Sequence, residues 1–227
     1  MDIEIVARPG AAAARLKLHG GEAVTAEVGA MIAMSDGFQV ETTTATKGKG
    51  SLLGGLKRMF SGENFFLNHF TATADGQELV VGPTGLGDIV HHRLTGGTLV
   101  VQGSSWLASS HGITIDTTWQ GLTSAVFSGE GIFWVKCSGE GDVLVNSFGG
   151  IYEVEVDDAG YVVDTGHIVA FDDTLKFAVG KASQSLIGSF LGGEGLVCKF
   201  SGRGKLYCQS HNPPSFGKLL GPKLKPR

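Results

Sequence analysis

Short alternations of apolar and polar residues run along almost the whole chain, and most of them end at Gly, Asp or Ser. Successive side chains of a strand point to opposite faces, so a period of two is typical of a β-strand with one buried face. Val, Ile, Thr and aromatic residues fill these runs, as strands prefer. The predicted strands are RLKLH, EAVTAEV, QELVVG, GTLVVQG, GITIDTTWQG, GIFWVKCSG, GDVLVNSFGG, IYEVEVDDAG, LKFAVG, GLVCKFSG and KLYCQS.

Helical spacing is rare along this chain. Only SLLGGLKRMF (51–60) and SQSLIGSFL (183–191) place apolar residues three and four positions apart, and both stretches are short. The pattern therefore predicts an all-β fold of antiparallel strands with only short helices.

Three stretches repeat one pattern: FSGENFFLNHFTATADGQELVV, FSGEGIFWVKCSGEGDVLVN and LGGEGLVCKFSGRGKLYCQ. Each has a Gly-Glu step, an apolar strand, a polar turn that contains Gly, and a second strand. The glutamates are Glu63, Glu130 and Glu194, and the segments before them also match as Gly, strand, turn and strand. Because the neighbours of the Gly-Glu step differ each time, we interpret the step as a structural bend. The chain is predicted to contain three copies of one β unit.

The repetition divides the chain into three predicted units and a tail. Unit 1 covers 1–95 with a short helical insertion near 51–60, unit 2 covers 96–150, and unit 3 covers 151–212. A basic, Pro-containing tail, expected to be a solvated arm, follows at 213–227. We expect the three units to pack as one compact domain.

The chain also resembles a known family. GLKRMFSGENFFLNHF (55–70), LHGGEAVTAEVGAMIAMSDGFQVET (18–42) and GEGIFWVKCSGEG (129–141) are similar to the altered-inheritance-of-mitochondria protein 24 family, and the resemblance covers nearly the whole chain. It implies repeated β units like those of the tryptophan RNA-binding attenuator protein, a β-sandwich or short double-stranded β-helix. It also implies a homotrimer and no known enzymatic activity.

Composition narrows the function classes. There are 36 Gly among 227 residues, about twice the usual frequency, which indicates many tight turns with positive φ. The net charge is −4, whereas a nucleic-acid binder usually has a basic surplus. We therefore expect no nucleic-acid partner, and RNA binding by analogy with the attenuator protein is the least favoured alternative.

Signals for export or membrane insertion are not predicted. No apolar run approaches ~18 residues, and the charge-broken start with Asp2 and Glu4 resembles neither a secretory signal nor a transit peptide. The three cysteines form no CxxC pair. We expect a cytoplasmic, reduced protein.

Motifs for catalysis are incomplete. Six Gly-x-Gly steps lack the third Gly of a dinucleotide fingerprint, and we interpret them as hairpin turns. Gly180-Lys181 is followed by Ala182, so it is not a phosphate-binding loop. His91 and His92 are neighbours, and on a strand they point to opposite faces, where they cannot share one ion. We expect no catalytic residue, no cofactor and no metal.

Cys198 and Cys208 are placed symmetrically about Arg203 in CKFSGRGKLYC. A hairpin at this point would set them opposite each other, at a Cβ separation slightly long for an unstrained disulfide. We favour two small reduced core residues over a disulfide.

One segment carries the interface candidates. On a helix over 51–60 one face would hold four apolar residues with a fifth beside it: Leu52, Leu56, Met59 and Phe60, with Leu53 adjacent. The favoured interpretation is a lid or a subunit interface, because so short a helix needs tertiary packing. The alternative is a basic amphipathic helix on an anionic membrane or a partner.

The function predicted from these features is a non-enzymatic, homo-oligomeric β scaffold. It would associate with itself as a trimer and bind a partner protein or a membrane surface. The alternative from another class is a small-ligand or metal-dependent enzyme on a double-stranded β-helix. A deep pocket with convergent polar groups would favour the enzyme, and a flat apolar or basic rim would favour the scaffold.

Overall fold

The structure, a computed structural model, describes residues 1–44, 66–116, 134–181 and 196–224. The two stretches with helical spacing, 51–60 and 183–191, lie outside the described residues.

Strands make up most of the described chain, as the period of two predicts. They are β1 (Asp2–Val6), β2 (Ala13–Leu18), β3 (Ala23–Glu27), β4 (Met31–Met34), β5 (Gln39–Thr44), β6 (Phe66–Thr71), β7 (Gln77–Val81), β8 (Ile89–Gln102), β9 (Trp106–Ser110), β10 (Ile113–Asp116), β11 (Trp134–Asn146), β12 (Ile151–Val156), β13 (Tyr161–Asp164), β14 (Ile168–Asp172), β15 (Lys176–Lys181), β16 (Leu196–Ser201) and β17 (Gly204–Gln209). In β2 the leucines Leu16 and Leu18 are buried, whereas Arg15 and Lys17 are exposed. The alternation therefore does separate a core face from a solvent face.

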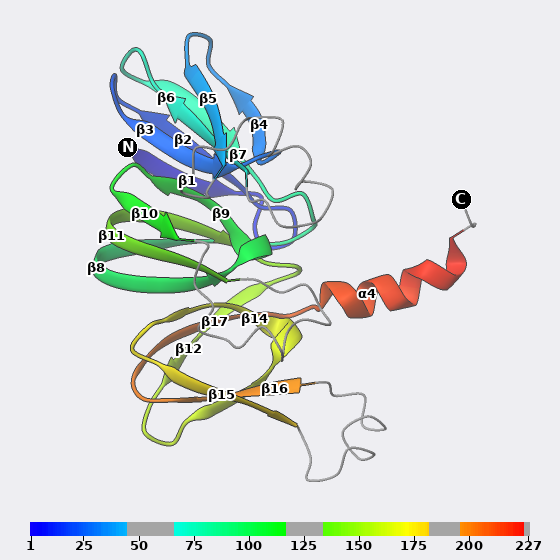
Figure 1. Ribbon diagram of the computed structural model, residues 1–227. Helices are drawn as coiled ribbons and strands as arrows, with labels where there is room; N and C mark the ends of the chain where they lie inside the picture. The colour runs from blue at the N-terminus through cyan, green and yellow to red at the C-terminus, as the bar shows by residue number, and fades with distance from the viewer. Residues whose placement is uncertain (45–65, 117–133, 182–195, 225–227) are drawn as a thin grey trace.

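The described strands form three antiparallel sheets. One has the order β1-β2-β7-β4, and another has the order β13-β16-β15. Between them lies a ten-stranded sheet of order β12-β17-β14-β8-β11-β9-β3-β6-β5, with β10 paired to β11. Figure 1 shows the strands stacked in chain order, with β1 to β7 at the top and β12 to β17 at the bottom. The fold is mostly β.

The hairpin predicted at the Gly-x-Gly step 139–141 is wrong. GIFWVKCSG and GDVLVNSFGG were expected as two strands, but β11 is one strand through residues 138–141, with a bulge between Ser138 and Glu140. Gly139 makes this possible, because it has φ +117° and a side chain there would collide with the Gly112 carbonyl. Strands β6 and β7 are likewise not paired with each other, because they belong to different sheets.

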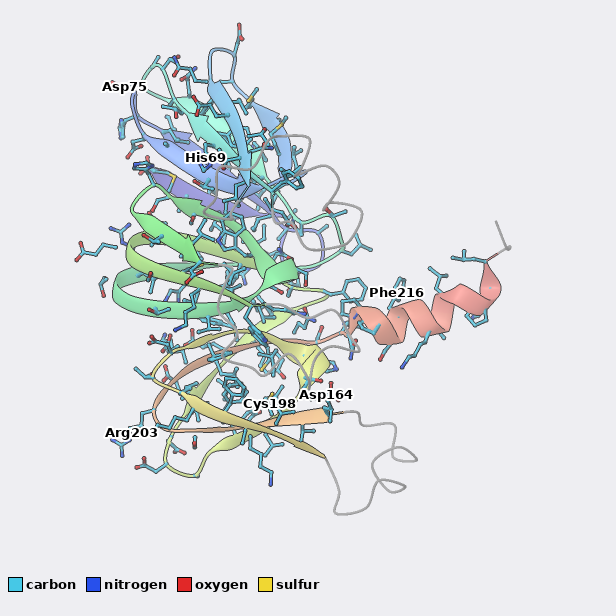
Figure 2. The ribbon with its side chains drawn as sticks, in the orientation of Figure 1. His69, Asp75, Asp164, Cys198, Arg203 and Phe216 are labelled. Atoms are coloured by element: carbon cyan, nitrogen blue, oxygen red, sulfur yellow. The ribbon has the colours of Figure 1, made fainter. Side chains whose placement is uncertain are left out.

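The expected pairing of Cys198 with Cys208 is also wrong. Strand β16 lies in the three-stranded sheet and β17 in the ten-stranded one, so Cys198 is opposite Val163 whereas Cys208 is opposite Tyr152. All three cysteines are free and buried, as the interpretation of small reduced core residues predicts. Figure 2 shows Cys198 and Arg203 in separate parts of the C-terminal region.

The described part of the predicted solvated arm, residues 213–224, is mostly helical and has no buried residue. Helix α4 (Pro213–Leu220) is followed by the 3₁₀ turn η3 (Gly221–Lys223). The Asn212 side chain caps α4 by accepting from the Ser215 backbone N–H, and prolines occupy the first turn, where their missing N–H is harmless. Figure 1 shows α4 projecting away from the sheets.

Three apolar cores follow one another through the stack. The first lies among β2, β3, β6 and β7 and also takes in Leu107 and Leu144, which come from β9 and β11. The second surrounds Trp106 and the middle strands, and the third surrounds Phe171. Because side chains from one region enter the core of the next, the three regions pack together. Strand β8 spans the predicted unit boundary at 95/96.

Candidate functional site

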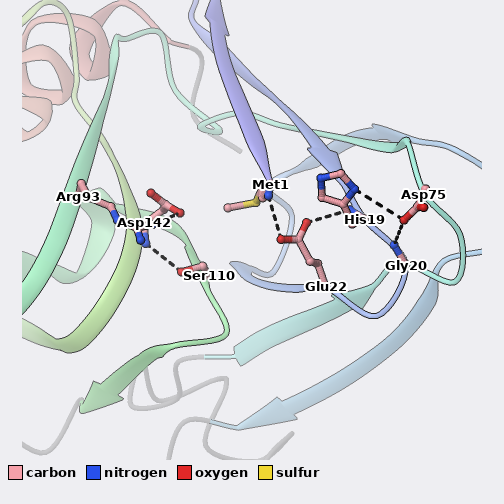
Figure 3. A network of polar contacts seen from close by, with 8 residues as sticks. All are labelled: Met1, His19, Gly20, Glu22, Asp75, Arg93, Ser110 and Asp142. Carbon is pink, nitrogen blue, oxygen red and sulfur yellow. Dashed lines mark hydrogen bonds and ion pairs between the residues drawn. The ribbon is translucent and has the colours of Figure 1, made fainter.

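A polar groove of about 670 Å³ lies where the N-terminal strands meet β9 and β11. Its walls come from the β2–β3 turn, the β9–β10 turn, and the middles of β8 and β11. Figure 3 shows the two sides of this region, with Glu22 on one side and Asp142 on the other. Several charged side chains line this groove, Glu22, Arg93, Glu140 and Asp142 among them, so it is a candidate active site.

Asp142 is the best-connected acid of this groove. Its carboxylate accepts hydrogen bonds from Arg93 Nη1 at 2.8 Å and from His91 Nε2 at 2.7 Å, and its backbone N–H donates to Ser110 Oγ at 2.8 Å (Figure 3 shows the Arg93 and Ser110 contacts). Burial opposes its ionisation, but the hydrogen bonds from Arg93 and His91 hold the pKa of Asp142 below its usual value. Asp142 is therefore a fixed anion and a poor general acid.

On the other side of the groove, Glu22 is also held by its neighbours. It accepts from the backbone N–H of His19 and from the N-terminal ammonium of Met1, each at 2.8 Å. The hydrogen bond from the His19 backbone contributes most to lowering the pKa of Glu22. Two of the three acids that line the groove, Glu22 and Asp142, are thus engaged in structural contacts, and the third is Glu140.

These contacts do not assemble a nucleophile. Ser110, His91 and Asp142 lie close together, but no hydrogen bond joins the Ser110 hydroxyl to the His91 ring, and Ser110 Oγ is taken by a backbone amide. A serine nucleophile needs a base within hydrogen-bond reach. His92 instead bonds the Tyr207 hydroxyl at 2.8 Å, so the two neighbouring histidines face different partners, as the strand alternation predicts.

A smaller pocket of about 350 Å³ lies at the end of β3, beside the 3₁₀ turn η1 (Gly103–Ser105). Burial raises the pKa of Glu27 in this pocket to about 7. The buried amide of Gln209 also lines it, but that amide accepts from the Phe148 backbone and donates to the Gly166 carbonyl. Among the described residues that line this smaller pocket, Glu27 is the one acidic or basic side chain, so it has no second acid or base beside it.

Several strands at the edges of the described sheets carry exposed large apolar residues, and we call two of them, β4 and β13, the open edges. Among the described strands, β4 pairs on one side only, with β7, and Ile32 is 60% exposed while Met34 is 42% exposed. Within the same described ranges, β13 pairs on one side only, with β16, and Val162 is 57% exposed while Tyr161 is 40% exposed. Unpaired apolar edges normally carry charges or a cover, so these two mark contact surfaces.

Helix α4 presents a third apolar surface, which we call the α4 apolar face. It consists of four exposed side chains: Phe216, Leu219, Leu220 and Leu224. Only the start of α4 is held by the sheets in the described structure, through the Phe148–Phe216 ring contact with centroids 5.4 Å apart. Figure 2 shows Phe216 on the projecting helix. Leu219, Leu220 and Leu224 follow Phe216 by three, four and eight positions, a helical spacing that we did not predict from the sequence.

The predicted interface residues cannot be compared with these surfaces. All five of them, Leu52, Leu53, Leu56, Met59 and Phe60, lie outside the described residues. In the ranges that the structure does describe, no group of three His, Cys, Asp or Glu side chains is placed to hold a metal ion. Among the described helices, none has the length and apolar content needed to span a membrane.

Comparison with known proteins assigns the family. The family model described as Mitochondrial biogenesis AIM24 matches residues 3–211. The chain is 30% identical over 206 residues to the uncharacterised protein M6_Spy0233 of Streptococcus pyogenes serotype M6, covering 89% of this chain and 82% of that protein. The crystal structure of protein SPYM3_0169 from Streptococcus pyogenes is similar at a TM-score of 0.78 and 26% identity, covering 98% of this chain and 99% of that one. The chain belongs to the AIM24 family, as its sequence resemblance predicts.

Proposed function

We propose that this protein is a non-enzymatic β scaffold, built from three copies of one unit, that assembles with copies of itself into a homotrimer. The observation that carries the proposal is the pair of open edges, one near the start of the strand order and one near its end. Apolar strand edges are aggregation hazards unless another strand covers them, and assembly of identical chains is one way to cover them.

The strand pairings support three copies. The pairs β4·β7, β9·β11 and β14·β17 follow one another along the chain, and so do β5·β6, β10·β11 and β15·β16. In each copy, two consecutive strands pair with the two ends of one later segment. In the first copy, for example, β4 and β5 pair with β7 and β6. This later segment contains the repeated Gly-Glu pattern or directly follows it. One pairing scheme used three times is expected of duplicated units.

A shared irregularity adds to this support. In β4, β9 and β14 the register shifts by one residue just before an alanine, namely Ala33, Ala108 and Ala170. A bulge is a specific local structure and tends to be retained within a family. Its appearance at the matching place in three strands is difficult to explain without a common unit.

The engagement of the polar groups supports a non-enzymatic role. Asp142, Glu22 and Ser110 are fixed by contacts within the fold, and Glu27 stands without a catalytic partner in the described structure. General acid–base or nucleophilic chemistry requires groups that can exchange protons with a substrate and with each other. The described residues that line the polar groove and the smaller pocket offer no such pair.

Native mass spectrometry of the purified protein tests both halves of the proposal. The expected result is a single species of three chains, each of 23.7 kDa, without added mass. A monomer would contradict the homotrimer. A stoichiometric bound nucleotide, metal or organic ligand would contradict the scaffold and favour a ligand-binding function.

A second candidate function concerns the α4 apolar face, which we propose docks on an anionic membrane surface. Four apolar side chains are exposed there, and Lys218 and Lys223 lie on the same segment, followed by Lys225 and Arg227 in the sequence. Exposed apolar residues next to basic ones suit the boundary between lipid tails and anionic headgroups.

Sedimentation with lipid vesicles tests this second candidate. The protein should bind vesicles that contain phosphatidylglycerol and not vesicles of phosphatidylcholine alone. Leu219→Asp should abolish the binding, whereas a substitution on another exposed surface, Leu86→Asp, should leave it unchanged. Equal binding by wild type and Leu219→Asp, or no binding by wild type, would reject the membrane and leave a protein partner as the occupant of this face.

A further inference from the structure

Two strand junctions inside the chain define how successive units join. In the first, β3 pairs with β9 and sets Thr25 opposite Ser109. In the second, β8 pairs with β14 and sets Val100 opposite Phe171. Both junctions are antiparallel. Each joins an early strand of one unit to the bulged strand of the next unit.

The bulged strand of the first unit has no such partner in the described structure. Met34 comes directly after the alanine that follows the bulge in β4, as Ser109 does in β9 and Phe171 in β14. Ser109 and Phe171 both lie in a junction. Met34 therefore holds the place of a junction residue but is left at an open edge.

The early strand of the third unit, β13, is the corresponding unpaired strand at the last unit of the chain. Strand β13 ends at a 3₁₀ turn, η2 (Thr165–His167), just as β8 ends at η1. Counting back from these turns, Val162 corresponds to Val100 and Val163 corresponds to Val101. Val100 and Val101 are the residues of β8 that pair with β14. Val162 thus holds the junction place on β13.

Exposure separates the filled junctions from the open edges. At the second junction Val100 is 1% exposed and Phe171 is 2% exposed. Val162 is 57% exposed and Met34 is 42% exposed, although both hold the same places in their own units. Two apolar side chains that would be buried by the same kind of pairing are left in solvent in the single chain.

We infer that β4 of one chain pairs antiparallel with β13 of a second chain, with Met34 opposite Val162 and Ala33 opposite Val163 across the contact. This inference rests on the proposed self-assembly and names the surface that performs it. The occupant of both open edges is a second copy of this chain, because each edge continues a junction that the chain already makes twice.

The inferred pairing also accounts for the sizes of the sheets. In the ten-stranded sheet, each in-chain junction joins two triplets, which are groups of three paired strands. One triplet resembles β12-β17-β14 and the other resembles β8-β11-β10. The two smaller sheets, β1-β2-β7-β4 and β13-β16-β15, are the triplets left over, with β1 added to the first. Pairing β4 with β13 would join these leftovers into a third sheet of the same kind. The contact is head to tail, so it closes into a ring or continues as a filament.

Cysteine cross-linking between differently tagged chains tests the inferred register. One chain carries Met34→Cys and the other carries Val162→Cys, and the co-expressed pair is treated with a short bifunctional thiol reagent. Both positions are exposed in the single chain, and the three native cysteines are buried, so the new thiols react without disturbing the fold. The expected result is a covalent dimer that carries both tags and holds at most about half of the chains, because chains of the two kinds mix at random in the assembly.

Three controls decide how the result is interpreted. Each single variant alone should give no dimer, because a head-to-tail contact never brings two copies of one position together. Met34→Cys with Tyr161→Cys should cross-link several-fold less, because Tyr161 is one residue out of register and points to the other face. Self-cross-linking of either single variant would show a two-fold contact and overturn the inference.

The same experiment separates this inference from the proposed function. If native mass spectrometry shows a trimer but the tagged pair gives no mixed dimer, the inference is wrong and the chains assemble through another surface. If the wild-type chain is a monomer, both are wrong.

Discussion

The two in-chain junctions and the two open edges are built from the same strand types but have opposite surroundings. At the junctions the paired alanines Ala108 and Ala170 are fully buried, and their neighbours along the strands are buried as well. At the open edge of β4, Ala33 holds the equivalent place and is exposed. One local sequence pattern thus occurs both inside the fold and at its surface.

This difference is what the proposed repeat predicts, because each unit would carry the same apolar positions wherever it stands in the chain. A residue such as Met34 is suited to a buried junction whether or not its own chain supplies the partner strand. Apolar residues at the ends of a repeated structure therefore indicate where a further unit is accommodated. In this protein that further unit is inferred to come from another chain.

The sharpest contrast is expected from one substitution made at equivalent places. Ala170→Asp puts a carboxylate between β14 and β8 with no partner, which should cost more than about 4 kcal/mol and prevent folding. Ala33→Asp places the same group on the open edge, where water can solvate it in the single chain. The single chain should therefore still fold, which a strand-rich circular dichroism spectrum and a cooperative urea transition of Ala33→Asp would show, whereas Ala170→Asp should give neither. Equal losses from both variants would contradict the comparison.

The next largest effect concerns the contact that fixes the first unit to the start of β8. Arg8 donates two hydrogen bonds, of 2.8 and 2.9 Å, to Asp88, which is 2% exposed. Arg8→Met leaves this buried carboxylate without its cation and should cost about 2–4 kcal/mol in chemical denaturation.

A matched control uses the other arginine of the same region. Arg15 pairs with Glu4 at the exposed surface, so Arg15→Met should cost less than about 1 kcal/mol. If the two substitutions destabilise the protein equally, the Arg8–Asp88 contact stabilises the fold no more than an exposed ion pair does.

A pH-dependent effect is expected from Glu27 at the end of β3. Its pKa in the folded protein is about 7, above the ordinary value of 4.5, so between these values the unfolded chain loses a proton that the folded chain keeps. Stability from this group is full below about pH 4.5 and is lost as the pH rises through 7. Glu27→Gln should therefore stabilise the protein at pH 8, by at most about 3 kcal/mol, and have little effect at pH 4.

Glu153 provides a comparison of opposite sign. The hydrogen bond from Lys205 lowers the pKa of Glu153, so this carboxylate stabilises the fold above its ordinary pKa. Glu153→Gln should be destabilising at pH 8 and nearly neutral at low pH, in thermal denaturation. Parallel pH profiles for the two variants would contradict the assignment of Glu27 to a buried, unpaired site.

The smallest stability change is expected on α4. Leu219 is 64% exposed and contributes to no buried core, so Leu219→Asp should change the unfolding free energy by less than about 0.5 kcal/mol. Its effect should instead be seen in vesicle binding. A large loss of thermal stability would show that α4 packs against the fold.

The strands were predictable because a half-buried strand has alternating apolar and polar residues in its sequence. Leu16 and Leu18 alternate with charged residues, and the same rule located nearly every described strand. The connections were less predictable. A Gly-rich step such as 138–141 is compatible with a turn or with a bulge in a continuous strand, and only the partner strands decide between them.

The surfaces were predictable only in part. The repeat suggested that some strand edges are open. That these edges are β4 and β13 depends on which strands pair between units, and the local sequence pattern does not predict that pairing. Helix α4 was missed because Pro213, Pro214 and Gly217 mask its apolar spacing, although prolines in a first turn are compatible with a helix. The predicted interface at 51–60 remains a prediction.

The central claim is that the open edges join identical chains, and multi-angle light scattering of wild type beside Ala33→Asp tests it most directly. The account predicts a wild-type mass of three chains and a folded Ala33→Asp protein with the mass of one chain, 23.7 kDa. A wild-type mass of 23.7 kDa, or an Ala33→Asp protein that stays at the wild-type mass, would contradict it.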